Sequence, residues 1–287
     1  MDLIDTSGSG GLCEVGCVLT FEVTEAALFA IQVAPSTTAG VVLDERVEIT
    51  NDPMSAPASV VEIVADHGGR VHLVSVPPGV MSFAYAAELQ THRGTPSAPN
   101  DDFVASMDAV VALRQSRYCP SDVLAGYATT EFFDVLGDGP DAIALRVASW
   151  VFERCAYSAG SSGPLDTALD TLLSGAGVCR DFAHLTITLC RALGVPARLA
   201  AVYAPGLALM DFHAVVEILA HDGWWVLDPT RLAPRGAMVR IATGRDAADT
   251  AFATTLRGAA ELVASSVFAS SNGDLPGDDH AHLFPLA

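Results

Sequence analysis

The hydrophobic pattern of this chain changes its period near residue 95, and this change limits the folds open to it. Before that point, five short runs alternate apolar and polar side chains, and turn residues such as Pro35, Asn51 and Gly68 separate them. The runs cover residues 17–23, 28–33, 46–50, 60–65 and 70–76. Period-two runs at this spacing predict a small antiparallel β domain. The Pro- and Ser-containing segment Gly94–Asn100 then predicts a linker.

Beyond the linker, apolar residues recur at helical spacing and are followed by further strand patterns. Helices are expected at 101–115, 140–155, 165–174 and 181–193, and strands at 197–203, 213–219, 224–228, 238–242 and 260–268. Helices followed by antiparallel strands predict the α+β class. We therefore expect an N-terminal β domain over 1–95, an α+β core over 96–270 and a loose C-terminal tail over 271–287.

The composition narrows the classes of partner. The chain has 287 residues, 51% of them hydrophobic, which is enough for a substantial core. It carries a net charge of −19 and has no lysine, so nucleic acid and anionic membrane surfaces are not expected as partners. No uncharged apolar stretch reaches about 18 residues, and the first residues do not have the pattern of a signal peptide. Six irregularly spaced cysteines favour reduced thiols over a disulfide framework, so the sequence predicts a cytoplasmic protein.

Cys179 lies at the N-terminus of the helix expected at 181–193. The free N–H groups and the dipole at a helix N-terminus favour a thiolate, which is the nucleophilic form of cysteine. The alternative is that Cys179 is a small buried hydrophobe, the usual environment of a free cysteine. Asp181 is expected to cap the first turn of the helix, and Cys119, Cys155 and Cys190 are expected in the core.

A histidine and an aspartate lie on the two strands that follow. His213 opens one strand and Asp228 ends the next, and a thiol, an imidazole and a carboxylate are the groups needed for nucleophilic acyl chemistry. In an antiparallel pair, the residue numbers of opposite positions add to a constant that defines the register. If this sum is 441, the side chains of His213 and Asp228 lie opposite each other, about 4.5–5.5 Å apart. A turn at Asp222–Gly223 gives a sum of 445 and separates them by roughly 13 Å along the strand. The functional hypothesis therefore predicts the longer loop Leu219–Asp222. The alternatives are a surface histidine at a strand end and an Asp-Pro turn.

Other candidate sites are weaker. Cys13 and Cys17 could supply two thiolates to a metal, but no matching second pair follows, so no metal site is predicted. There is no phosphate-binding or dinucleotide motif, and no cofactor is expected. The remaining histidines with no comparable context are expected to face solvent or make local hydrogen bonds: His184, His221, His280 and His282.

Four motifs together resemble bacterial transglutaminase-like proteins. They are GVCRDFAH at 177–184, LGVPAR at 193–198, HAVVE at 213–217 and WVLDPT at 225–230, and the similarity continues through 231–234 and 239–249. The resemblance is dense from about residue 100 to 270 and weaker over 12–95. It implies a papain-like α+β core with Cys179 as nucleophile, His213 as general base and acid, and Asp228 orienting the imidazole. Arg245 and Asp246 resemble a loop that borders the cleft, which implies a substrate-binding role.

The resemblance implies a range of activities. The family includes transglutaminases, cysteine peptidases, amidases and members that have lost activity. It often has tryptophan two residues after the histidine, where this chain has Val215. The sequence therefore predicts a cysteine enzyme that cleaves or transfers amide or peptide acyl groups of a peptide or protein substrate through a thioester. Hydrolysis is favoured because water is always present. The alternative is a catalytically silent binding or scaffold module with the same fold.

Overall fold

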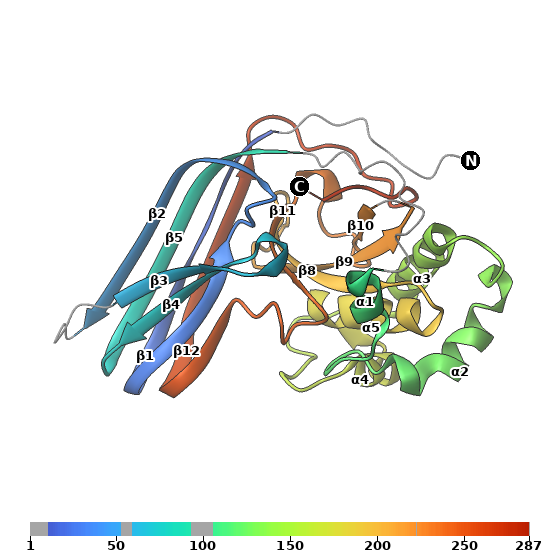
Figure 1. The fold of residues 1–287 in the computed structure, drawn as a ribbon, viewed down its shortest axis with the longest axis horizontal. Coiled ribbons are helices and arrows are strands. Elements are labelled where there is room, and N and C mark those ends of the chain that lie inside the picture. Colours follow the sequence, from blue (N-terminus) through green and yellow to red (C-terminus); the bar gives the residue numbers. More distant parts are fainter. Residues whose placement is uncertain (1–10, 53–58, 93–105, 222, 287) are drawn as a thin grey trace.

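A computed structural model describes residues 11–52, 59–92, 106–221 and 223–286. It shows two parts side by side, a large curled antiparallel sheet and a mixed part of helices and strands (Figure 1). The predicted α+β class and the N-terminal β domain are confirmed. The linker predicted at Gly94–Asn100 lies outside the described residues.

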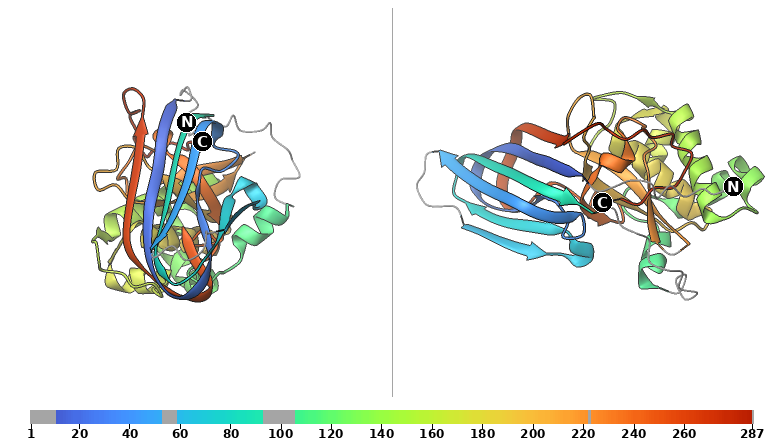
Figure 2. Two further views of the ribbon diagram at one scale, coloured as in Figure 1. Left: turned by 90° about the vertical axis from the view of Figure 1, so that its left-hand side faces the viewer. Right: turned by 90° about the horizontal axis from the view of Figure 1, so that it is seen from above.

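The first part is built around one long strand, β1 (Leu12–Ala34). The first half of β1 pairs with β5 and its second half with β4, so the sheet curls about this strand (Figure 2). β2 continues the sheet beyond β5, and β3 continues it beyond β4. The bounds of these strands are β2 (Gly40–Asp52), β3 (Ser59–Val64), β4 (Arg70–Val76) and β5 (Gly79–Thr91). The two runs expected at 17–23 and 28–33 are thus one strand, and β5 is an additional strand that was not expected.

A sixth strand of this sheet, β12 (Ala253–Ser271), comes from near the end of the chain. It runs antiparallel to β1 from Cys13 opposite Ser271 to Ile31 opposite Ala253. The predicted core boundaries 96–270 had placed the strand expected at 260–268 in the second part. The structure instead places it in the sheet of the first part. The physical reason is that β1 would otherwise present a long row of unpaired N–H and C=O groups at its free edge.

The inner face of the curled sheet forms a core that continues into the second part. Alternate residues of β1, including Val15, Leu19 and Phe29, are completely buried. The same cluster contains Tyr203 from the second part. The Tyr203 hydroxyl donates a hydrogen bond to the carbonyl oxygen of Val33, with 2.8 Å between the oxygens. The two parts thus share one core, which fixes the first sheet against the second.

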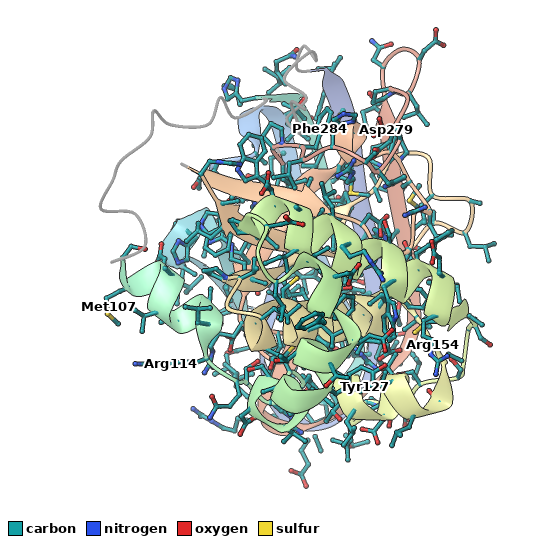
Figure 3. All side chains as sticks on the ribbon, turned by 90° about the vertical axis from the view of Figure 1, so that its right-hand side faces the viewer. Met107, Arg114, Tyr127, Arg154, Asp279 and Phe284 are labelled. Atoms are coloured by element: carbon teal, nitrogen blue, oxygen red, sulfur yellow. The ribbon has the colours of Figure 1, made fainter. Side chains whose placement is uncertain are left out.

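The second part contains an antiparallel sheet of order β10-β9-β8-β11, covered by helices. Figure 3 looks onto its helical side, with Tyr127 of α2 and Arg154 of α3 at the opposite end of the view from Asp279 and Phe284. None of the helices in the described segments is long and apolar enough to cross a membrane. The bounds are α1 (Met107–Leu113), α2 (Ser121–Glu131), α3 (Pro140–Arg154), β6 (Ala156–Tyr157), α4 (Ala168–Ser174), β7 (Ala176–Gly177), α5 (Cys179–Ala192), β8 (Ala197–Tyr203), β9 (His213–Ala220), β10 (Gly223–Leu227) and β11 (Val239–Gly244).

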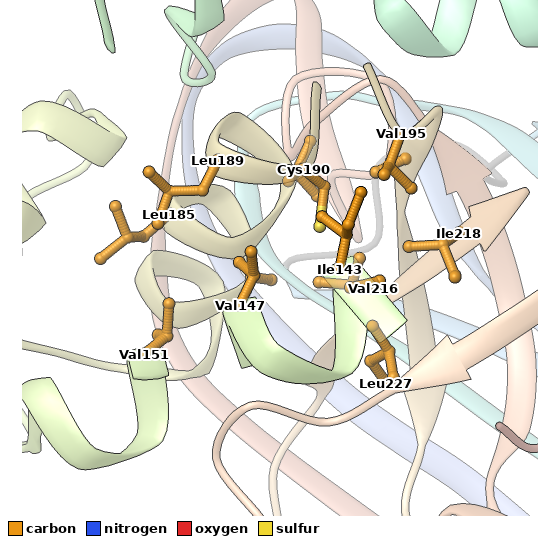
Figure 4. Close-up of a cluster of buried hydrophobic side chains, with 14 of the residues drawn as sticks. Ile143, Val147, Val151, Leu185, Leu189, Cys190, Val195, Val216, Ile218 and Leu227 are labelled. Atoms are coloured by element: carbon orange, nitrogen blue, oxygen red, sulfur yellow. The ribbon is translucent and has the colours of Figure 1, made fainter. Parts of the chain in front are cut away.

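Helix α5 lies at the centre of the second part. Its apolar residues, among them Leu185 and Leu189, belong to one buried cluster with Val147 of α3 and Val216 of β9 (Figure 4). Polar residues of α5 such as Thr188 are also buried, and the Thr188 hydroxyl donates to the carbonyl oxygen of His184. A helix buried on most of its surface is held rigidly, so the position of its first residue is well defined.

The expected helices are present in the described segments, and one more is found. Helices α3, α4 and α5 match the expected ranges to within a few residues, and α1 begins at Met107. The additional helix is α2, whose pattern is weakened by Gly126, Thr129 and Thr130, residues of low helix propensity. Packing rather than propensity forms it, because Leu124 and Ala128 are buried in the core around α5.

The C-terminal segment up to residue 286 packs against the second sheet, so the prediction of a loose tail is wrong for this part. Leu283, Phe284 and Leu286 are buried. The N–H of Val226 in β10 donates to the carbonyl oxygen of Phe284 at 2.7 Å. The polar residues before this point suggested disorder, but the apolar residues that follow gain more from burial than the chain loses by ordering.

Candidate active site

Cys179 is the first residue of α5 and is partly exposed, whereas the other five cysteines are buried. The Val178 N–H donates to Oδ2 of Asp181 at 2.8 Å and thereby fixes the start of the helix, which confirms the capping role expected for Asp181. Gly177 is needed here, because a Cβ at this position would lie 2.6 Å from the Cβ of Asp181. The local sequence therefore presents one accessible thiol at a helix N-terminus.

His213 and Asp228 form a buried pair. His213 opens β9 and Asp228 directly follows β10, and their side chains are almost inaccessible to solvent. Nε2 of His213 lies 3.1 Å from Oδ2 of Asp228. Because a carboxylate only accepts, we assign the proton of this bond to Nε2. Thr230 donates its backbone N–H and its hydroxyl to Oδ1 of Asp228, at 2.9 and 2.7 Å, so the carboxylate is held from both sides.

The strand register differs from both registers considered from the sequence. Paired positions of β9 and β10 sum to 443, as in Trp224 opposite Leu219. The predicted loop Leu219–Asp222 is therefore wrong, because Leu219 and Ala220 remain paired in the strands. In this register His213 and Asp228 are diagonal neighbours on one face, a separation that long side chains can bridge. The expected contact is thus made, but across the diagonal.

The charges of the pair stabilise each other. Burial works to lower the pKa of His213, but the charge and hydrogen bond of Asp228 and the contact with Cys179 outweigh burial and raise this pKa. Burial works to raise the pKa of Asp228, but the His213 charge and the Thr230 hydrogen bonds lower it. The pair is therefore imidazolium and carboxylate at neutral pH. Since Nε2 is occupied by Asp228, the buried Nδ1 is the nitrogen left for the thiol, and no other hydrogen-bond partner is found for it in the described segments.

Cys179 and His213 open into the same cavity, which has a volume of about 440 Å³. Strands β1, β8, β9, β11 and β12, the N-terminus of α5 and the loops before α2, α4, β9 and β12 contribute to its wall. Much of the wall is apolar and includes Val178, Leu199, Ala201, Phe212, Ile241 and Phe252. A nucleophile and an acid–base group thus face one enclosed space large enough for part of a substrate.

The two predicted substrate-binding residues do not line this cavity. Arg245 lines a separate cavity of about 460 Å³, and its guanidinium pairs with Asp249, with 2.8 Å between Nε and Oδ2. Asp246 is buried, and its Oδ2 accepts the backbone N–H of Tyr118 at 2.9 Å. The loop does reach the catalytic cavity, but through Ala247. The structure therefore brings neither predicted side chain to Cys179.

Tyr157 lies beside Cys179 and was not singled out from the sequence. The short strand β6 pairs in parallel with β7, which places Tyr157 next to Gly177. The Tyr157 side chain lies close enough to Cys179 for the cysteine to influence its pKa. Burial and the nearby Cys179 raise the pKa of Tyr157 to about 12, so the hydroxyl keeps its proton at neutral pH. A two-residue strand leaves no periodic signal, which is why the sequence pattern does not show this residue.

Two other positions have structural roles. Val215, where related chains often have tryptophan, is fully buried and packs with Phe284 and Leu286 of the C-terminal segment rather than lining the cavity. His184 is also buried, unlike the solvent-exposed or locally bonded residue expected. Its ring stacks on Tyr118 at 5.0 Å, and its Nε2 accepts the N–H of Ala247 at 3.1 Å. Burial lowers the pKa of His184 to about 3, so its imidazole is neutral. The ring holds the loop that carries Ala247 in place through this hydrogen bond.

The cysteine pair considered for a metal lies in the core of the first sheet. Cys13 and Cys17 are buried, and burial raises the pKa of both thiols, that of Cys17 to about 12. A thiol held in this protonated form is a poor metal ligand. In the part of the chain that the structure describes, no group of three His, Cys, Asp or Glu residues is placed to hold a metal ion.

Comparisons with known proteins agree with the geometry of the site. The family model of the transglutaminase-like superfamily matches residues 135–229, which include Cys179, His213 and Asp228. The crystal structure of a "putative cysteine protease" from Cytophaga hutchinsonii is 31% identical and covers 97% of both chains, with a TM-score of 0.82. An uncharacterized protein of Mycobacterium leprae is 31% identical over 120 residues, and this match spans 39% of the present chain and 43% of that protein.

The similarity to the Cytophaga protein extends over both parts of the fold, including the curled N-terminal sheet, because it covers nearly the whole of each chain. The family model adds the segment from Val135, shortly after α2, to Pro229, in which the thiol, the imidazole and the carboxylate lie. Fold and motif thus agree, and the chain belongs to the transglutaminase-like superfamily, a family of cysteine enzymes.

Proposed function

We propose that this protein is a cysteine-dependent enzyme that hydrolyses an amide bond of a peptide or protein, with Cys179 as nucleophile, His213 as acid and base, and Asp228 orienting the imidazole. The observation that carries the proposal is the buried His213–Asp228 pair, whose His213 lines the same cavity as the accessible Cys179. Membership of a family of cysteine enzymes supports it. We also propose a cytoplasmic location, in keeping with six unpaired cysteines.

In the first half of the proposed reaction, the Cys179 thiolate attacks the carbonyl carbon of the amide. A C–S bond forms, and the carbonyl oxygen becomes an oxyanion. The imidazolium of His213 then gives its Nδ1 proton to the amide nitrogen, the C–N bond breaks, and the amine leaves. The products of this half are an amine and a thioester on Cys179. Asp228 keeps the ring in the orientation that allows this transfer, because it holds the Nε2 proton.

In the second half, His213 is neutral and can accept a proton at Nδ1. A water molecule gives this proton to His213 and attacks the thioester carbonyl, which releases a carboxylic acid and restores the thiolate–imidazolium pair. An amine in place of water would give transfer instead. We favour water because the cavity wall, which is largely apolar, offers no evident site for a second, amine substrate.

Replacing Tyr157 by phenylalanine is expected to lower kcat for amide hydrolysis about 100-fold. The side chain lies beside Cys179 and its hydroxyl keeps its proton at neutral pH, so it can donate a hydrogen bond to the oxyanion. The measurement is kcat and KM with N-acetyl-phenylalanine 4-nitroanilide. The matched control is Tyr127→Phe, since Tyr127 lies on α2 and packs against Trp150. An unchanged kcat in Tyr157→Phe would exclude the hydroxyl as an oxyanion donor.

Iodoacetamide at pH 6 is expected to label Cys179 selectively among the six cysteines. The other five are buried, and burial raises the pKa of each of their thiols. Labelling followed by mass spectrometry of peptides measures this directly. The selectivity should be lost in His213→Ala, which removes the imidazolium, and retained in His221→Ala, which removes an exposed histidine. Slow and uniform labelling of all six would instead favour the silent scaffold module and contradict the proposed enzyme.

A further inference from the structure

We propose that the catalytic cavity selects an amide whose acyl side carries a bulky apolar side chain, and that the N-terminal sheet builds part of this selectivity. The inference rests on the proposed function of Cys179, because it assigns the occupant of the cavity into which the thiol opens. Three properties of the wall support it: a stacked aromatic pair, a set of small side chains, and few charged groups.

The aromatic pair is formed by Phe212 and Phe252. Their rings stack with centroids 5.0 Å apart and an interplanar angle of 17°, and Phe212 also packs on Tyr203. Phe212 directly precedes His213, so this surface lies beside the imidazole. A fixed aromatic surface next to the reacting groups favours an apolar or aromatic side chain of the substrate.

Small side chains leave the space that such a group needs. Five alanines line the cavity, contributed by β8, β9, the loop after β11 and β12. The cavity volume of about 440 Å³ falls within the range of small-molecule sites. The space is therefore large enough for a side chain such as leucine or phenylalanine together with the neighbouring amide. The alanines are Ala201, Ala214, Ala247, Ala251 and Ala253.

Besides the reacting groups, the charged residues that line the cavity are Arg180, which is partly held by hydrogen bonds, and Asp211, which is exposed to solvent. Nη2 of Arg180 donates to the Ser162 hydroxyl and to the carbonyl oxygen of Gly163, both at 2.7 Å. Asp211 is exposed to solvent, and its Oδ1 accepts the N–H of Phe212 at 2.7 Å. Much of the remaining wall is apolar, so an acidic or basic acyl side chain buried against it would lose hydration.

The N-terminal sheet completes this wall. Phe252 directly precedes β12, which pairs along β1. The backbone N–H of Gln32 in β1 donates to the carbonyl oxygen of Phe252 at 2.9 Å, and Gln32 itself lines the cavity. The first sheet thus holds one of the two rings in place, which gives it a role in substrate selection as well as in the core.

The test compares active-site alkylation by N-acetyl amino acid chloromethyl ketones that differ only in the side chain: glycine, leucine, phenylalanine, glutamate and lysine. Each rate of Cys179 labelling is divided by the iodoacetamide rate for the same protein, which removes differences in thiol reactivity. We expect the leucine and phenylalanine ketones to react about 10- to 200-fold faster than the glycine ketone. The glutamate and lysine ketones should react more slowly than the glycine ketone.

Two variants probe the wall from opposite directions. Ala251→Leu fills the cavity from a loop, where it should not disturb folding, and should slow the phenylalanine ketone at least about 10-fold relative to glycine. Phe252→Ala removes one ring and should reduce the preference for the apolar ketones. The matched control is Val263→Ala, because Val263 is exposed on β12 and does not line the cavity.

The outcomes separate this inference from the proposed function. If iodoacetamide labels Cys179 selectively but the glutamate, lysine or glycine ketone reacts as fast as the apolar ones, the apolar pocket is wrong and the proposed enzyme stands. If neither reagent labels Cys179 selectively, the proposed function fails and the inference fails with it. An apolar preference that Ala251→Leu and Phe252→Ala both leave unchanged would place the selectivity elsewhere and overturn the assignment of this wall.

Discussion

Cys179→Ala is expected to reduce hydrolysis of N-acetyl-phenylalanine 4-nitroanilide by about 10⁴- to 10⁶-fold, the range found when the nucleophile of a catalytic triad is removed. Without the thiol no thioester can form, and the cavity retains only His213 and the groups that would bind the oxyanion. Release of 4-nitroaniline measures the rate. The loss should be accompanied by a native circular dichroism spectrum, because Cys179 is partly exposed and its removal leaves no cavity in the core.

The matched control for this experiment is Cys155→Ala. Cys155 is also a free cysteine, but it is buried at the end of α3 and belongs to the core around α5. Its removal should lower stability and leave the rate per folded molecule near that of the wild type. A Cys179→Ala protein that still turned over the anilide would contradict nucleophilic catalysis by this thiol, because the remaining cysteines are buried.

Asp228→Asn should lower kcat/KM by about 10⁴-fold, the effect of this change in Ser-His-Asp enzymes. The amide is nearly the same size as the carboxylate, so the packing is kept while the charge is lost. An asparagine can donate to Nε2 and so favour the wrong tautomer of His213. The Thr230 N–H and hydroxyl, which donate to Oδ1 of Asp228, would also lose a charged acceptor.

The same variant tests the electrostatic argument through the pH dependence. The Asp228 charge raises the pKa of His213, so the imidazolium is kept through neutral pH and is lost only as the pH rises through this raised value. Removing the charge lowers the pKa of His213. The alkaline limb of kcat/KM should therefore move to lower pH in Asp228→Asn. Asp122→Asn, on α2, is the matched control. An unmoved limb would show that Asp228 does not set the protonation of His213.

Most of the second part could be predicted because its signals are local. The pattern around Cys179 placed a thiol at a helix start, and the Gly-Val-Pro sequence at 194–196 ended that helix near its observed end at Ala192. The strand that His213 opens and the strand that ends just before Asp228 were also visible. Motifs of this kind combine a structural break with a chemical group, so they fix position and chemistry together.

The register between those strands could not be predicted, because alternation constrains which face a residue occupies but not its partner. The sums 441, 443 and 445 all keep His213 and Asp228 on one face, and only the pairing observed from Ala220 to Val216 distinguishes them. Strand β5 was a different case, since Met81, Phe83, Tyr85 and Leu89 alternate clearly and are buried. That signal was present in the sequence.

Contacts between distant segments also could not be predicted from the sequence. Tertiary packing decides three such contacts. They are the pairing of β12 with β1, the bridge between Phe284 and β10, and the position of Tyr157 beside Cys179. Nothing in the residues of β12 distinguishes a strand of the second sheet from a strand of the first, because both would alternate in the same way. The loop around Arg245 was recognised. Which of its side chains faces the cavity depends on the hydrogen bond from the Ala247 N–H to His184.

The pairing of the first long strand with the last has a consequence for synthesis on the ribosome. β1 is made early, yet its neighbour along nearly its whole length is β12, which emerges only after the other named helices and strands. Until then the nascent chain carries an open strand edge, a hazard for association with other chains. Because Phe252 directly precedes β12, the wall beside His213 also closes only at that stage. A nascent or truncated chain therefore has the thiol without its complete cavity, and the order of synthesis delays completion of the site until β12 has been made.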